Sequence, residues 1–166
     1  MNSTGDVSLP HPAAPDWLRA ITIYMAVILV ANLIWETLQL PLYTIWTTGT
    51  ARDKAFAVIH CTLGDALIAL STLILALVSV GTKNWPDERH NLVLAVAIIL
   101  GVGYTIFSEW LNIVVRTSWA YSSLMPVVPV IGTGLAPLMQ WILIPAIGLT
   151  RARRATVAAR IQSPRE

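Results

Sequence analysis

Charge is the scarcest property of this sequence. Only 12% of the 166 residues are charged, about half of the roughly 25% that is typical of soluble domains. Hydrophobic residues make up 55% of the chain. So few charges cannot cover the surface of a water-soluble domain, and we therefore expect most of the chain to lie in a lipid bilayer.

Several chemical signatures are absent as well. The chain has one cysteine, Cys61, which excludes an internal disulfide. There is no Gly-rich phosphate loop, so nucleotide binding is not indicated. The isoelectric point is about 9.0, but the basic residues adjoin apolar runs, where they are typical of membrane topology. Nucleic acid is therefore not expected as a partner.

Four apolar runs are long enough, or nearly so, to cross a membrane. A span needs about 20 mainly apolar residues, and the candidate runs are residues 20–40, 55–80, 91–115 and 134–149. They predict an all-α integral membrane protein, folded as an antiparallel four-transmembrane-helix bundle. Residues 1–16 are predicted to be a disordered N-terminal tail, residues 17–150 the transmembrane domain, and residues 151–166 a basic cytoplasmic tail.

The distribution of Lys and Arg predicts the orientation, because short cytoplasmic segments are enriched in both residues. If the N terminus is inside, only three basic residues fall outside: Arg52, Lys54 and Arg116. The remaining basic residues then lie in the cytoplasm, most of them after residue 150. We expect both termini to be cytoplasmic and the protein to reside in the inner (plasma) membrane.

Polar side chains gather at one depth of the predicted bundle. Antiparallel threading places the ends of helices one and three beside the starts of helices two and four. The polar residues of this layer are Asn32, Glu36, Gln39, His60, Asp65, Glu109, Asn112, Arg116 and Gln140. On helix one, the spacings of four and three put Asn32, Glu36 and Gln39 on one face. Thr105, Glu109, Asn112 and Arg116 form a similar stripe on helix three, and both stripes are expected to face inward.

The charges in this layer need partners. A charged residue in the middle of a transmembrane helix costs about 2.5–3.5 kcal/mol. Arg116 is the only strong cation in the layer and can neutralise one or two carboxylates at most. A remaining carboxyl group is expected to be protonated, or to bind a cation or a ligand. Glu36, nearest the centre of its stripe, is the predicted group.

Aromatic residues and an unusual loop adjoin the layer. Trp35, Trp110 and Trp141 each stand beside a polar residue of the layer. They either belong to an interfacial aromatic belt or form the walls of a site. Residues 117–134 are rich in Pro, Gly, Ser and aromatic residues yet remain apolar. Such a composition fits either a re-entrant or lid segment between helices three and four, or an ordinary surface loop.

Three classes of function are compatible with these residues. In the first, the protein binds or transforms an amphipathic or lipid-like small molecule by acid/base chemistry. Its predicted catalytic residues are Glu36, Glu109, His60 and Asp65. Its predicted ligand-binding residues are Asn32, Gln39, Asn112, Arg116, Gln140, Trp35, Trp110 and Trp141.

Scattered positions also resemble the EXPERA or emopamil-binding family of four-helix membrane proteins. In that family an acidic residue follows a polar one by four positions in an early helix, as Glu36 follows Asn32 here. A polar residue near a tryptophan precedes a proline late in the last helix, as in QWILIP at residues 140–145. Asn32 stands where the family has a histidine.

The second and third classes use the same residues differently. In the second, His60 and the three carboxylates bind a metal ion, although no HxxxH, ExxH or CxxC spacing is present. In the third, the polar groups only join the helices of an accessory or assembly subunit, whose partner is a membrane complex or a second copy of the chain. The sequence identifies no metal and no cofactor.

Overall fold

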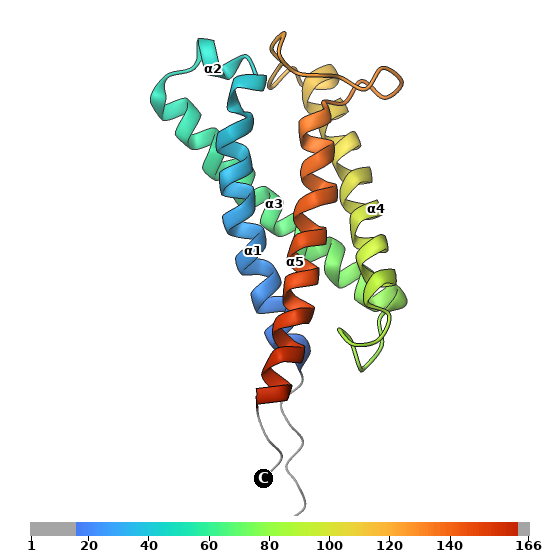
Figure 1. Ribbon diagram of the computed structural model, residues 1–166. Helices are drawn as coiled ribbons and strands as arrows, with labels where there is room; N and C mark the ends of the chain where they lie inside the picture. Colours follow the sequence, from blue (N-terminus) through green and yellow to red (C-terminus); the bar gives the residue numbers. More distant parts are fainter. Residues whose placement is uncertain (1–15, 163–166) are drawn as a thin grey trace, which may run out of the picture.

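The computed structural model describes residues 16–162, and within this range the secondary structure is helical (Figure 1). The long helices are α1 (Asp16–Gln39), α3 (Ala51–Val80), α4 (His90–Glu109) and α5 (Leu135–Gln162). Three short elements complete the set: the 3-10 helix η1 (Leu40–Leu42), α2 (Ile45–Thr48) and the π-helix η2 (Trp110–Val115). Most of the N-terminal tail predicted at residues 1–16 lies outside the described residues.

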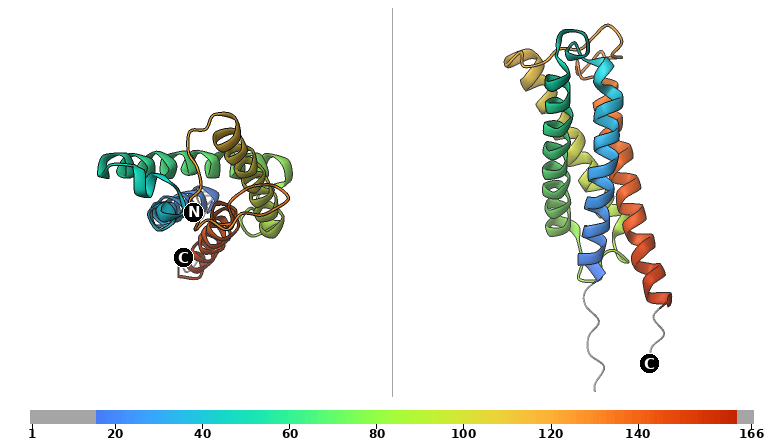
Figure 2. Two further views of the ribbon diagram at one scale, coloured as in Figure 1. Left: turned by 90° about the horizontal axis from the view of Figure 1, so that it is seen from above. Right: turned by 90° about the vertical axis from the view of Figure 1, so that its left-hand side faces the viewer.

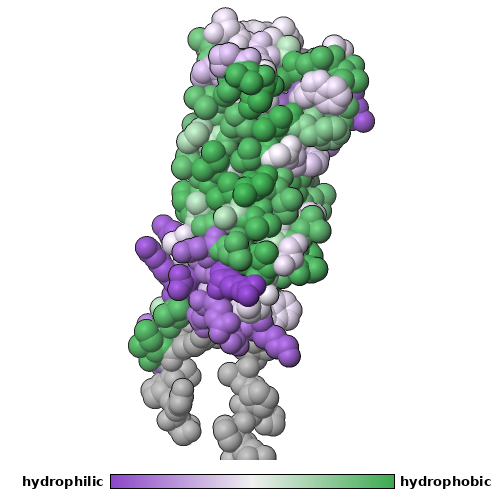
Figure 3. Space-filling model, turned by 90° about the vertical axis from the view of Figure 1, so that its right-hand side faces the viewer, coloured by the Kyte–Doolittle hydropathy of each residue, from purple (hydrophilic) through white to green (hydrophobic). Residues whose placement is uncertain are grey.

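Four helices are long and apolar enough to cross a membrane, which confirms the prediction of an all-α, multi-pass membrane protein. The apolar segments are Trp17–Leu42, Ala51–Val80, His90–Val115 and Leu135–Ala159. The surface in Figure 3 is largely hydrophobic along the helices, and hydrophilic side chains gather at the end where α1 begins and α5 finishes. This is the surface expected of a bilayer-spanning protein.

The long helices pack side by side, with α1 and α4 each in contact with both α3 and α5. In Figure 1, α1 and α4 run toward the end where residues 117–134 lie, and α3 and α5 run away from it. Helix α3 is tilted and crosses behind the other three, as Figures 1 and 2 show. A side chain at Gly148 would lie 2.9 Å from Cδ2 of Tyr24, so glycine permits the close approach of α5 to α1.

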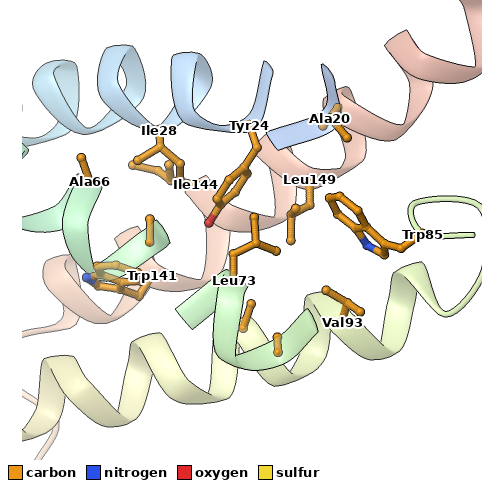
Figure 4. Close-up of a cluster of buried hydrophobic side chains, with 14 residues drawn as sticks. Ala20, Tyr24, Ile28, Ala66, Leu73, Trp85, Val93, Trp141, Ile144 and Leu149 are labelled. Atoms are coloured by element: carbon orange, nitrogen blue, oxygen red, sulfur yellow. The ribbon is translucent and has the colours of Figure 1, made fainter. Parts of the chain in front are cut away.

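An apolar core runs from the middle of the bundle, where Ala66 and Trp141 lie, to the end farthest from residues 117–134 (Figure 4). Tyr24 of α1, Leu73 of α3, Val93 of α4 and Leu149 of α5 are each at most 1% exposed, and Trp85 of the α3–α4 loop is 4% exposed. Because lipid is as apolar as these side chains, close packing holds such a core together more than the hydrophobic effect does. We call this end of the molecule the core half.

Helix α5 continues through the segment predicted to be a basic tail. It includes Pro145 without ending there and runs to Gln162, and both Ala152 and Thr156 are fully buried. Arg151, Arg153 and Arg154 are exposed on this extension. The arginines are therefore held on a packed helix.

Residues 117–134, which we call the covering segment, pass over the ends of the long helices (Figure 1). Tyr43 and Tyr121 form an isolated antiparallel bridge. Around it, the Thr44 N–H donates to the Ala120 carbonyl at 2.9 Å and the Ser122 N–H donates to the Leu42 carbonyl at 2.9 Å. The covering segment is thus tied to the turn that follows α1. We call this end of the molecule the site half.

Candidate functional site

Five polar side chains from three helices meet in the site half. We call them the carboxyl–amide cluster: Asn32, Glu36 and Gln39 of α1, Asp65 of α3, and Gln140 of α5. Asn32 and Gln140 are each 2% exposed, Gln39 is 7% exposed and Glu36 is 9% exposed. The α1 stripe predicted from spacings of four and three therefore faces inward.

Gln140 lies at the centre of the cluster. Its side-chain nitrogen is 2.7 Å from Oδ1 of Asn32 and 2.9 Å from both Oε1 of Glu36 and Oδ2 of Asp65. A primary amide nitrogen carries two hydrogens, so these three acceptors compete for them. One side chain of α5 thereby joins α1 to α3.

The rest of the cluster adds few donors. The Gln39 amide donates to Oε1 of Glu36 at 2.7 Å, and the Trp35 indole N–H donates to Oε1 of Gln39 at 3.2 Å. The Asn32 amide is directed to the Ile28 carbonyl within α1, at 2.8 Å. Counted by oxygen lone pairs, the cluster contains more acceptors than donors. It is completed only by a further proton, a cation or a donor group.

The two carboxyl groups of the cluster share one donor, because the Gln140 amide nitrogen lies 2.9 Å from Oε1 of Glu36 and 2.9 Å from Oδ2 of Asp65. Two carboxylates in contact at a buried position cannot both be charged without a large repulsion, and a shared proton removes it. Glu36 and Asp65 therefore form a pair that can hold and release one proton. The other three side chains of the cluster are amides, which do not ionise.

A second polar group, which we call the Glu109 cluster, lies where α4 meets the covering segment. Glu109 is 7% exposed, and the Tyr121 hydroxyl donates to its carboxylate. The same hydroxyl accepts the Gly134 N–H at 2.7 Å. The Tyr43 ring lies 5.5 Å from the Tyr121 ring, measured between centroids.

Burial, followed by the negative charge of Glu109, raises the pKa of Tyr43 well above its ordinary value. Burial and the hydrogen bond to Glu109 likewise raise the pKa of Tyr121. Both hydroxyls therefore keep their protons at neutral pH and act as donors. Tyr121 was not among the predicted site residues, because a tyrosine in an apolar loop has no helical periodicity from which its direction can be predicted.

The two clusters are neighbours but have different surroundings. Glu109 interacts electrostatically with Glu36 and Asp65, and Tyr43 interacts electrostatically with both Glu36 and Glu109. Within residues 16–162, no hydrogen bond joins Glu36 to Glu109 directly. The single predicted layer is thus a carboxyl–amide cluster with a tyrosine–carboxylate group beside it.

Two residues of the predicted polar layer, His60 and Arg116, are exposed. His60 is exposed and stacks on Phe56, with the ring centroids 5.4 Å apart. His60 and Asp65 are five residues apart, so they point about 140° from each other on a helix. Only Asp65 reaches the interior.

Arg116 is the other exception, and within residues 16–162 it is not a hydrogen-bond partner of Glu36, Asp65 or Glu109. Its side chain is exposed. The chain winds as a π-helix after Glu109, and the Arg116 N–H donates to the Leu111 carbonyl at 2.8 Å. This wider turn changes the register on which the stripe was predicted. Asn112, also on η2, is half-buried and donates locally to the Ser108 carbonyl at 2.9 Å.

The three predicted tryptophans differ in whether they face the interior of the bundle or its outer surface. Trp35 contacts the carboxyl–amide cluster through Gln39. Trp141 is 5% exposed, and its ring packs on α4 where a Cβ at Gly101 would lie only 2.4 Å from Cε3. Trp110 is 51% exposed, on the outer surface. Two tryptophans therefore face inward and one is placed as expected for an aromatic belt.

No family model, curated protein or solved structure matches the chain. The resemblance of scattered positions to the EXPERA family thus has no support from these comparisons.

Proposed function

We propose that the protein binds an amphipathic or lipid-like small molecule in the site half of a transmembrane bundle and exchanges a proton with it. The observation that carries this proposal is the meeting of Glu36 and Asp65 at the Gln140 amide. In this arrangement acceptors outnumber donors, and no basic side chain takes part.

The chemistry of the cluster defines the polar end of the ligand. Oxygen acceptors without enough donors favour a ligand group that donates hydrogen bonds, such as a hydroxyl or an ammonium group. The surrounding helices offer mainly apolar side chains, which suit the remainder of an amphipathic molecule. A proton shared by Glu36 and Asp65 supplies the acid, and the ionised partner supplies the base.

Glu109 and its surroundings support the same proposal. A π-helix begins directly after Glu109, and such segments occur frequently at functional sites. Tyr121 keeps the Glu109 carboxylate oriented by donating to it. In this proposal Glu109 is a second acid/base group, and Trp35 and Gln39 bound the site from α1.

The proposed topology is an antiparallel four-helix bundle in the inner (plasma) membrane with both termini in the cytoplasm. Exposed basic residues of the α3–α4 loop and of the α5 extension lie at the end where α1 begins, among them Lys83, Arg89 and Arg154. The opposite end carries Arg52, Lys54 and Arg116. This asymmetry supports an extracytoplasmic site half, with the covering segment on that face.

One observation favours a second candidate function. Gln140 hydrogen-bonds across α1 and α3 from α5, which is what interhelical glue in an accessory subunit would do. Binding of a metal has less support, because within residues 16–162 no group of three or more His, Cys, Asp and Glu side chains is arranged to hold an ion.

Glu36→Gln separates ligand binding from glue. Glutamine keeps Oε1, which accepts from Gln39 at 2.7 Å and from Gln140 at 2.9 Å, and its amide can donate to Asp65. We expect Glu36→Gln to fold in normal yield but to lose ligand binding, and Glu109→Gln to weaken it. Glu88→Gln, an exposed loop position, is the matched control.

The measurement is native mass spectrometry of small molecules that co-purify with each variant, together with the yield of monodisperse protein. Loss of the co-purified molecule from Glu36→Gln at unchanged yield supports the proposal. A fall in yield for Glu36→Gln and Glu109→Gln, with Glu88→Gln unaffected, assigns the carboxyl groups to glue.

A further inference from the structure

Four of the five side chains of the carboxyl–amide cluster are buried, and the fifth, Asp65, is half-buried. Gln140 and Asn32 are each 2% exposed, and Glu36 is 9% exposed. A ligand of the kind proposed above can reach these groups only if part of the chain moves. The part that moves should be the segment with the fewest buried contacts.

Each long helix packs against two others, whereas the covering segment has few buried side chains. Met125 and Thr133 are buried, but Leu124 is 66% exposed and Val130 is 94% exposed. Segments with few buried contacts open at lower free energy than packed helices do. The covering segment is therefore the element most readily displaced.

A small number of polar contacts holds this segment down. Tyr121 donates to Glu109 of α4 and accepts the N–H of Gly134 at the start of α5. Ser122 donates from its hydroxyl to the Pro41 carbonyl at 2.9 Å and from its N–H to the Leu42 carbonyl at 2.9 Å. Of these contacts, only the one from Tyr121 reaches an ionisable side chain of the site half.

We propose that residues 117–134 form a lid over the two clusters and that the hydrogen bond from Tyr121 to Glu109 is its latch. This inference rests on the proposed function, since it describes how the ligand enters that site. A ligand donor that takes the Glu109 carboxylate replaces the Tyr121 hydroxyl. Ligand binding and closure of the latch then compete for the same oxygen atoms.

The chain contains a natural reporter for the position of the lid. Cys61 is the only cysteine, is half-buried on α3, and interacts electrostatically with Glu36, Asp65 and Glu109. A charged thiol reagent does not cross lipid, so displacement of the lid should increase the rate at which the reagent reaches Cys61 from water. No ligand is needed for this measurement.

The experiment compares rates of Cys61 modification by a trimethylammonium methanethiosulfonate, with each variant in lipid nanodiscs. Loss of a hydrogen bond to a charged group shifts an opening equilibrium by about tenfold or more. We expect Tyr121→Phe to be modified about tenfold faster than the wild type. Tyr104→Phe, which removes an exposed hydroxyl from α4, should match the wild type, and Cys61→Ala should not react.

A rate for Tyr121→Phe equal to that of Tyr104→Phe overturns the lid. If Tyr121→Phe does not fold, Ser122→Ala decides, because it removes the hydroxyl that donates to the Pro41 carbonyl and accepts the Leu124 N–H, and it should accelerate labelling severalfold. Equal rates for Ser122→Ala and the wild type also overturn it. A failed lid leaves the mass-spectrometric test of Glu36→Gln intact, so the two proposals fail separately.

Discussion

The two halves of the bundle are built from the same four helices but differ in how their buried polar atoms are hydrogen-bonded. In the core half, the Tyr24 hydroxyl and the Trp85 indole N–H are buried without a hydrogen-bond partner, and close packing holds the helices. In the site half, Gln140 has three acceptors around a single nitrogen. Buried donors without a partner occur in both halves, since the Trp119 indole N–H of the covering segment is also unpaired, whereas three acceptors around one amide nitrogen are a feature of the carboxyl–amide cluster.

This contrast bears on why the carboxyl groups are present. Small residues and apolar packing hold the core half without any buried charge. Interhelical hydrogen bonds contribute about 0.6 kcal/mol each in membranes, and an amide or a hydroxyl would provide them as well as a carboxyl group. Two adjacent carboxyl groups are a costly way to join helices. The proposed function assigns them instead to chemistry that needs a proton or a ligand donor.

The largest effect is expected where the site half depends on its central donor. Gln140→Leu removes donors from Asn32, Glu36 and Asp65 at once. Because buried acceptors left unpaired cost about 1–3 kcal/mol each, we expect a loss of roughly 3 kcal/mol in the free energy of unfolding. Adding Glu36→Gln, which supplies a new amide, should restore part of it. Equal stability of Gln140→Leu and the wild type in detergent unfolding would contradict this picture of the cluster.

A smaller effect is expected at the contact between α4 and α5. In Gly101→Ala the new Cβ would lie 2.4 Å from the Trp141 ring, and a rigid ring cannot yield without moving the helix. Overpacking of this kind costs about 1–3 kcal/mol. Gly103→Ala, two residues along α4 with nothing within 4 Å of the new Cβ, is the matched control and should be neutral or slightly stabilising. Similar melting temperatures for the two variants would show that this contact is loose.

The smallest effects come from making one chemical change in both halves. Tyr121→Phe removes a hydroxyl that bonds Glu109 and Gly134, and we expect it to cost about 1.5 kcal/mol. Tyr24→Phe removes a buried hydroxyl that has no partner, so it should be neutral or stabilising. Thermal unfolding of the two variants in the same detergent measures both. A larger loss for Tyr24→Phe would reverse the comparison.

Much of the fold followed from the sequence because apolar runs of span length have few alternative structures. The inward stripe of α1 was predictable, since regular helix geometry fixes the direction of Asn32, Glu36 and Gln39. The outward direction of Arg116 was not predictable, because no residue pattern indicated that the chain changes from an α-helix to a π-helix after Glu109. The extension of α5 was missed for a related reason. Its arginines marked the end of an apolar run, yet Ala and Arg are strong helix formers, and the helix continues to Gln162.

The most direct test of the central claim is the free energy of unfolding of Glu36→Gln combined with Asp65→Asn, compared with that of the wild type. Both substitutions keep an acceptor and add donors, so they balance the cluster without changing its shape. Residues retained for function are often unfavourable for stability. We therefore predict that the double variant is more stable by about 1 kcal/mol or more, since one unpaired buried polar group costs at least that much. A double variant less stable than the wild type would show that the two carboxyl groups serve to hold the helices together, and the proposed site would then be glue.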